Sequence, residues 1–159
     1  MLLLRGDLVV PRLRVANYKL RAGDAQAALK DLQIAIKFEP ENVPAHLSLS
    51  DAYRLIGQYA LAKNELDWVE KREPSSPQIH YNRGLLYLLA PSIQGFTELQ
   101  KVNAAIKSFE KYKELRPKGE RSDVDELVKQ ATFKKAELEA LQKAKTPPPA
   151  APPPPAPKG

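Results

Sequence analysis

The sequence predicts an all-α fold, a right-handed α-α superhelix of about three helix pairs closed by a C-terminal capping helix. The first observation is a period, since residues 34 positions apart match along most of the chain, as in Ala28 and Ala62. The second is that a proline recurs near the end of each repeating unit. A period of 34 residues is typical of helix-turn-helix units that bury their apolar faces only against their neighbours. We therefore expect one domain over residues 1–145, followed by a tail at 146–159.

The first two units occupy about residues 9–42 and 43–76. Gly23 and Gly57 fall in the turn between the two helices of each unit, where a positive φ is expected and glycine adopts it without strain. The second helix of each unit should end at a proline, because proline has no N–H to donate and restricts the residue before it. The prolines are Pro40, Pro74 and Pro117, and the restricted residues are Glu39, Glu73 and Arg116.

The third unit, at about residues 77–119, carries a nine-residue insertion between its two helices. Pro91 should stop the first helix, and Gly95 breaks the loop that follows. Thr97 with Gln100 forms a capping box, so a new helix begins there, and we expect it to be about two turns longer than its counterparts.

Two interpretations of the inserted segment stay open. It is either a tolerated loop with a helix extension, or a contact platform that exposes Ile93 and Phe96 to a partner.

A capping helix is expected at about residues 122–145. Ser122 and Asp125 form a capping box at its start, and lysines in its last turn suit the helix dipole. Leu138 and Leu141 continue its apolar stripe outward. They either pack on the long helix of the third unit or meet a second chain.

The tail at residues 146–159 differs from the rest, because eight of its fourteen residues are proline. It should be an extended polyproline II strand of roughly 3 Å per residue. It acts either as a linker or as a ligand for a proline-binding domain, although the only basic residue beside it is Lys158.

The second unit matches a known repeat pattern most fully. Such a repeat requires large, small, aromatic, turn and terminating residues at fixed positions, and in this unit they are Leu49, Ser50, Tyr53, Gly57, Tyr59, Ala62, Leu66 and Pro74. This pattern resembles the tetratricopeptide repeat family. The first unit repeats it with Lys19 where tyrosine is usual. The long third unit and the Pro/Ala-rich tail resemble bacterial envelope-associated repeat proteins of the gliding-motility and pilus-biogenesis groups.

The resemblance implies a concave groove, lined by the first helix of each pair, that holds an apolar helix or an extended segment of a partner protein. The expected groove residues are Leu13, Asn17, Leu20, Leu47, Asp51, Arg54, Tyr81, Leu85 and Leu88. The expected second contact consists of Ile93, Phe96, Leu138 and Leu141. A homo-oligomeric or hetero-oligomeric assembly is compatible with both surfaces.

Some family members grip a peptide's terminal carboxylate with two lysines, two asparagines and one arginine. Only Asn17 matches that clamp, and Leu13, Ser48, Gln78 and Asn82 stand at its other positions. We therefore expect no affinity for peptides that depend on a free terminal carboxylate.

No motif in the sequence indicates catalysis, a metal or a cofactor. There is no cysteine, and His46 and His80 occupy the same position in successive units, which favours a structural role over metal ligation. We expect no catalytic residue, no metal ligand and no cofactor.

The net charge of +6 comes from both ends of the chain, and in the closing helices the signs alternate rather than forming a basic stripe. Nucleic acid is therefore not the expected partner. An interaction scaffold or assembly subunit is favoured, with a secretion-type chaperone or a helical-repeat RNA-binding protein as alternatives. No membrane span is expected, and the chain as written reads as cytoplasmic, or as a cell-envelope protein if an upstream signal segment is missing.

Overall fold

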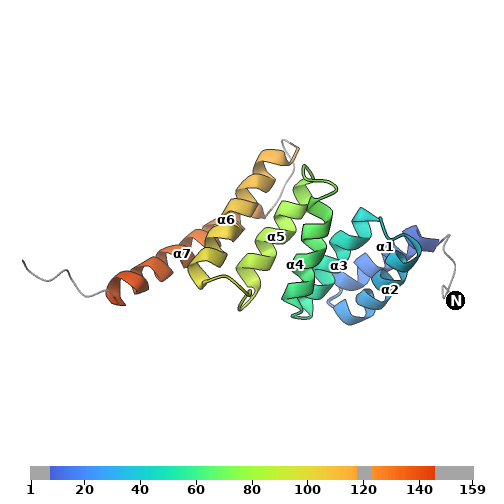
Figure 1. Cartoon of the computed structure of the whole chain (residues 1–159), viewed down its shortest axis with the longest axis horizontal. Coiled ribbons are helices and arrows are strands. Elements are labelled where there is room, and N and C mark those ends of the chain that lie inside the picture. Colours follow the sequence, from blue (N-terminus) through green and yellow to red (C-terminus); the bar gives the residue numbers. More distant parts are fainter. Residues whose placement is uncertain (1–7, 118–122, 146–159) are drawn as a thin grey trace, which may run out of the picture.

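The structure is a computed structural model that describes residues 8–117 and 123–145, and this part of the chain consists of helices with no strand. The helices are α1 (Val9–Arg21), α2 (Ala25–Phe38), α3 (Val43–Leu55), α4 (Tyr59–Glu70), α5 (Pro77–Leu89), α6 (Glu98–Leu115) and α7 (Val124–Lys145). They stack side by side in chain order along the long axis of the molecule (Figure 1). The predicted all-α superhelix of helix pairs is confirmed. The tail at residues 146–159 and Ser122 lie outside the described residues.

The helices form two layers. Each packs against its neighbours in the chain, and in addition α1 contacts α3 and α3 contacts α5. Within the described residues, no comparable packing joins α2 to α4 or α4 to α6. The first helices of the pairs therefore approach one another most closely and make the inner layer of the curved stack.

Local hydrogen bonds fix where several helices begin. The carboxylate of Asp24 accepts from the N–H of Ala27 at 3.0 Å, and the amide oxygen of Asn42 accepts from the N–H of Ala45 at 2.9 Å. The predicted capping box is present, because Thr97 and Gln100 bond reciprocally at the start of α6.

The interhelix turns confirm the glycine prediction. Gly23 and Gly57 have φ angles of 85° and 80°. A side chain at either position would be strained in this left-handed region.

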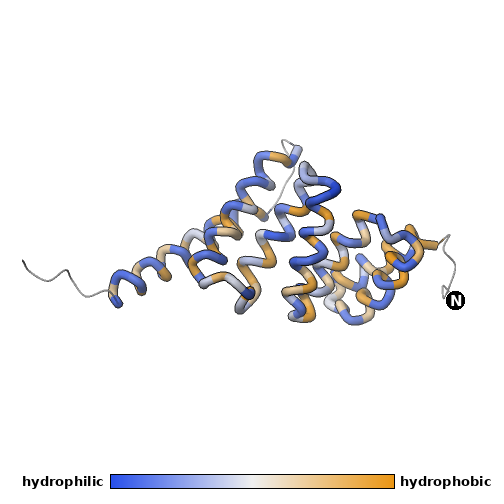
Figure 2. Tube along the Cα trace, viewed as in Figure 1, coloured by the Kyte–Doolittle hydropathy of each residue, from blue (hydrophilic) through white to orange (hydrophobic). Residues whose placement is uncertain are grey.

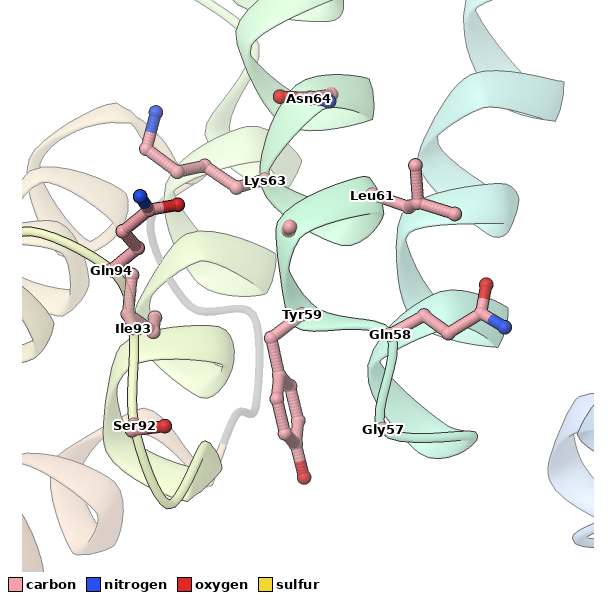
Figure 3. A pocket seen from close by; sticks show the side chains of 10 residues that line it. Gly57, Gln58, Tyr59, Leu61, Lys63, Asn64, Ser92, Ile93 and Gln94 are labelled. Carbon is pink, nitrogen blue, oxygen red and sulfur yellow. The ribbon is translucent and has the colours of Figure 1, made fainter.

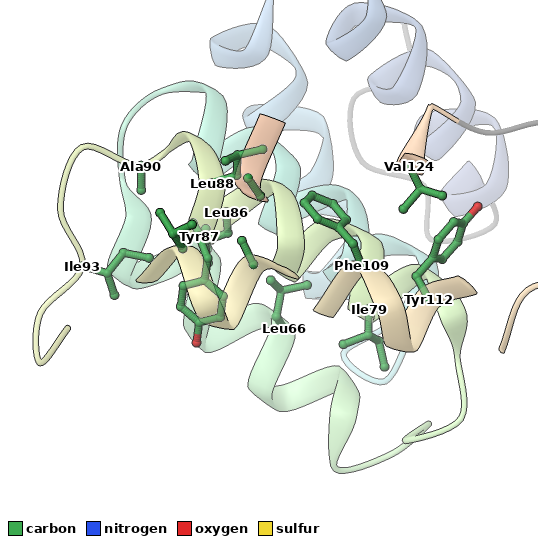
Figure 4. Close-up of a cluster of buried hydrophobic side chains, with 14 of the residues drawn as sticks. Leu66, Ile79, Leu86, Tyr87, Leu88, Ala90, Ile93, Phe109, Tyr112 and Val124 are labelled. Carbon is green, nitrogen blue, oxygen red and sulfur yellow. The ribbon is translucent and has the colours of Figure 1, made fainter. Parts of the chain in front are cut away.

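Small residues let the paired helices touch. Ala28, Ala62 and Ala105 on the second helices are all buried, as expected. Gly84 on α5 faces the ring of Phe109 on α6 so closely that an added Cβ would lie 2.4 Å from the ring's Cε1 atom. Figure 4 shows Phe109 within the larger of two apolar clusters, which joins α4, α5, α6 and α7.

One helix end differs from the prediction. α4 ends at Glu70 rather than just before Pro74. The N–H groups of Arg72 and Glu73 both turn back to the carbonyl oxygen of Val69, at 2.9 and 2.8 Å. This turn places the Arg72 guanidinium 3.6 Å from the centre of the Trp68 ring. A cation–π contact therefore forms where a further turn of α4 was predicted.

α6 is longer than the other second helices, as expected. With 18 residues it exceeds α2 by four and α4 by six, an excess of between one and two turns where about two were predicted. The rest of the insertion forms the loop at residues 90–97, called the inserted loop below.

No helix in the described part of the chain is long and apolar enough to cross a membrane. Figure 2 agrees, because hydrophobic and hydrophilic residues alternate along the helices.

The contact between Gly84 and Phe109 leads to a prediction. Gly84→Ala should lower the free energy of unfolding by roughly 1–3 kcal/mol, because the new methyl group overpacks a fully buried ring. This outweighs the gain in helix propensity of at most about 1 kcal/mol. Urea denaturation measures the change.

The control is the same substitution in a Phe109→Leu background, where the smaller side chain leaves room for the methyl group. There Gly84→Ala should be neutral or stabilising. Equal destabilisation in both backgrounds would contradict this account of the helix contact.

Candidate functional site

The inner layer places most of the predicted groove residues at its surface. Asn17 is exposed, and the partly exposed residues are Leu20, Leu47, Asp51, Arg54, Tyr81 and Leu85. The expectation is wrong for Leu13 and Leu88, which are buried and belong to the two apolar clusters. Their neighbouring helices cover them, so they hold the stack together instead of facing a ligand.

Two contacts pair polar side chains of this surface with one another. The hydroxyl of Ser48 donates to the amide oxygen of Asn17 at 2.8 Å, which links α3 to α1. Arg54 pairs with Asp51 at 3.2 Å. Burial raises the pKa of Asp51, and the neighbouring Arg54 opposes that effect only in part. The middle of the inner layer is thus electrically balanced and flanked by leucines.

The start of α7 closes one end of this surface. The Tyr81 hydroxyl donates to the two carboxylate oxygens of Asp123 at 2.8 and 3.0 Å, and the Tyr81 ring lies 5.2 Å from the ring of Tyr112. Burial, followed by the bond to Asp123, raises the pKa of Tyr81, so its phenol keeps its proton. Tyr81 is therefore already engaged within the chain.

Two groove-edge residues were missed in the sequence. Leu55 and Leu89 end α3 and α5 and are 49% and 54% exposed. They are 34 positions apart, so the period itself would have paired them. They extend the apolar surface toward the turns between the paired helices.

The four residues of the expected second contact differ in exposure. Ile93 is 8% exposed and packs in the larger cluster, so the interpretation of the insertion as a contact platform is wrong for this residue. Phe96 is exposed, with its ring 5.2 Å from that of Tyr87. Leu138 packs in part against the core, as its alternative interpretation held, whereas Leu141 is 58% exposed.

A buried lysine anchors the inserted loop. Lys101 is 1% exposed, and its ammonium donates to the carbonyl oxygens of Ala90 and Pro91 and to the carboxylate of Glu98 at 2.7 Å. These carbonyls lie just beyond the last turn of α5, where a cation also suits the helix dipole. The bond to Lys101 lowers the pKa of Glu98 below its ordinary value. The loop is therefore held in one place.

The anchored loop makes one wall of a pocket of about 610 Å³. The other wall is the turn before α4 and its first turns. The pocket is lined by Gly57, Gln58, Tyr59, Ala60, Leu61, Lys63, Asn64, Ser92, Ile93 and Gln94. Figure 3 shows the Tyr59 ring between the inserted loop on one side and the turn at Gly57 and Gln58 on the other. No sequence signal identified this pocket, because its walls come from two repeats.

Contacts within the chain hold the His46 ring at both of its nitrogens and on one face. Its Nδ1 lies 2.6 Å from a Glu65 oxygen, its Nε2 lies 2.8 Å from the Pro40 carbonyl oxygen, and its ring stacks on Trp68 at 3.6 Å. Neither ring nitrogen is turned toward open space. For His80, burial lowers the pKa. Among the described residues there is no group of three His, Cys, Asp or Glu side chains that could hold a metal ion.

Comparisons with known proteins identify the repeat. Two family models described as tetratricopeptide repeat match residues 19–86 and 56–120. These matches do not support the closer resemblance to gliding-motility and pilus-biogenesis proteins. No curated protein and no solved structure matches the chain significantly.

A first prediction concerns the anchor of the inserted loop. Lys101→Met should lower the free energy of unfolding by about 1–3 kcal/mol, because the carbonyl oxygens of Ala90 and Pro91 lose their donor. Amide exchange at residues 92–97 should accelerate. Lys107→Met, at an exposed position of the same helix, is the matched control and should change stability by less than about 0.5 kcal/mol.

The pH dependence gives a second readout of the same variant. The folded-state pKa of Glu98 lies below 4.5. The contribution of its ionised carboxylate to the free energy of unfolding is therefore complete above that pH, and it is lost as the pH falls through the lowered pKa. Lys101→Met should lose most of this acid-side component and keep the smaller part that comes from Lys134. If amide exchange at residues 92–97 and the change of stability with pH in acid were both the same as in the wild type, Lys101 would not be the anchor of the loop.

A second prediction concerns terminal carboxylates. Leu13 and Asn82, at two clamp positions, are buried, and the Asn17 amide oxygen already accepts from Ser48. We expect a peptide with a free C-terminus and its amidated form to bind equally weakly in isothermal titration calorimetry. A preference of about tenfold or more for the free carboxylate would contradict this.

Proposed function

Because this chain belongs to the tetratricopeptide repeat family, whose repeats generally mediate protein–protein interactions, we propose that it is a non-catalytic scaffold that holds a partner segment on its inner layer. The observation that carries the proposal is a set of half-buried leucines, one on each of α1, α3 and α5. They are Leu20, Leu47 and Leu85, extended by the exposed Leu55 and Leu89.

The chemistry of this surface favours an apolar protein segment. Two internal contacts, Ser48 with Asn17 and Arg54 with Asp51, satisfy polar groups between the leucines. A partner helix or extended strand would therefore gain chiefly by burying apolar side chains, as in helix-in-groove recognition. Polar groups placed among apolar contacts fix the orientation of a partner more than its affinity.

The same surface disfavours the alternative partners. An RNA ligand requires several unpaired cations that contact phosphates, and the one cation among the predicted groove residues, Arg54, is paired with Asp51. A secretion-type chaperone would use the same apolar surface, and it differs from a scaffold in holding one unfolded client rather than a folded assembly.

Blocking the groove tests the proposal. Ser48 is half-buried on α3 next to Asn17, so Ser48→Arg would place a long charged side chain between the leucines. Proteins captured by the tagged wild type and identified by mass spectrometry should bind this variant about tenfold more weakly. Gln33→Arg, at an exposed position on the outer helix α2, is the control and should bind normally.

Thermal melting of both variants separates a blocked groove from a damaged fold, and both should melt like the wild type. Equal capture by wild type and Ser48→Arg would refute the groove. Retention of RNA that falls steeply with salt would favour the nucleic-acid alternative.

A further inference from the structure

The pocket beside the inserted loop lies outside the proposed groove and has a distinct chemistry. Its charged and polar side chains are Gln58, Lys63, Asn64, Ser92 and Gln94, all of which can donate hydrogen bonds, and none of the described residues that line it is acidic. Its single cation, Lys63, pairs with Asp67 at 2.6 Å. The apolar part comes from the Tyr59 ring and the side chains of Leu61 and Ile93.

This combination suits a ligand rich in carbonyl acceptors and poor in N–H donors. A proline-rich segment has these properties, since proline lacks an N–H and the polyproline II conformation leaves every carbonyl free for outside donors. Its rings pack on aromatic and apolar walls, and little conformational entropy is lost when it binds. The pocket volume of about 610 Å³ is within the range of sites that take small ligands or short segments.

The chain itself carries such a segment. Between residues 147 and 157, eight of eleven residues are proline, and only Ala150, Ala151 and Ala156 keep a backbone N–H. The run of four prolines at 152–155 is the longest. We infer that the pocket between the start of α4 and the inserted loop is a receptor for this proline-rich tail, which docks there within the same chain.

The position of α7 makes the reach adequate. Lys134 lies 3.4 Å from Glu98, so the middle of α7 is beside the first residue of α6, which directly follows the inserted loop. From Lys134 to Lys145, α7 continues about 16 Å further at 1.5 Å per residue. The four prolines begin seven residues after Lys145, and at about 3.1 Å per residue they cover roughly 22 to 31 Å from it. An extended tail can therefore return to the loop.

Charge permits the same pairing. The tail between residues 146 and 157 carries no charged side chain, and the pocket's only cation is neutralised by Asp67. Neither side has to desolvate an unpaired charge, so ring burial and hydrogen bonds from the amide side chains decide the affinity.

The absence of cysteine allows a direct test in the full chain. Gln94→Cys places a thiol in the pocket wall, and Ala156→Cys places one beside the four prolines. Under mild oxidation at low protein concentration, this pair should form an intramolecular disulfide at least about tenfold faster than the control pair, because docking raises the local thiol concentration. The control pair joins Ala156→Cys to Asn103→Cys, an exposed position on α6 outside the pocket.

A second variant keeps the test independent of the fold. Replacing the four prolines at 152–155 with serine leaves all described residues unchanged and should slow the Gln94–Ala156 cross-link to the control rate. Equal rates for the Gln94 and Asn103 pairs would overturn the inference, as would a serine tail that reacts as fast as the proline tail. Disulfides that form only between chains would overturn docking within one chain.

Discussion

Close approach of paired helices at fixed intervals is the constraint on which this structure depends. Ala28, Ala62 and Ala105 are buried on the second helices, and Gly84 meets Phe109 from the opposite side. Where such contacts are tight, each helix pair has one relative orientation, and the 34-residue period repeats that orientation along the stack. The inner layer of α1, α3 and α5 follows from this repetition.

The insertion interrupts the period without interrupting the stack, and a buried charge explains how. Lys101 donates to carbonyls just past the end of α5 and to Glu98 in the first turn of its own helix. The ammonium thus holds the two ends of the inserted loop together, and its hydrogen bonds offset much of the cost of burial. The fixed loop then adds a wall that a standard repeat lacks, and the pocket beside α4 results.

Features set by neighbours in the sequence were predicted well, whereas features set by distant elements were not. The positive φ angles of Gly23 and Gly57 and the capping box at Thr97 depend on a few adjacent residues. The burial of Ile93 depends on the cluster that α4 to α7 build around it, and the bond from Tyr81 to Asp123 joins residues 42 positions apart. Sequence periodicity indicates which face a residue occupies, but not what later parts of the chain place upon it.

The charges at the inner layer and at the pocket are paired locally, although the chain as a whole is basic. The net charge is +6, yet the inner layer pairs Arg54 with Asp51, and the pocket pairs Lys63 with Asp67. Binding at either place would release few counterions and would depend weakly on salt, in contrast to nucleic-acid binding. The inner-layer leucines and the pocket also lie on different helices of the stack for the most part, since the pocket is built from the start of α4 and the inserted loop. A tail in the pocket would therefore leave the leucines of α1, α3 and α5 free for a partner, so one chain could hold both.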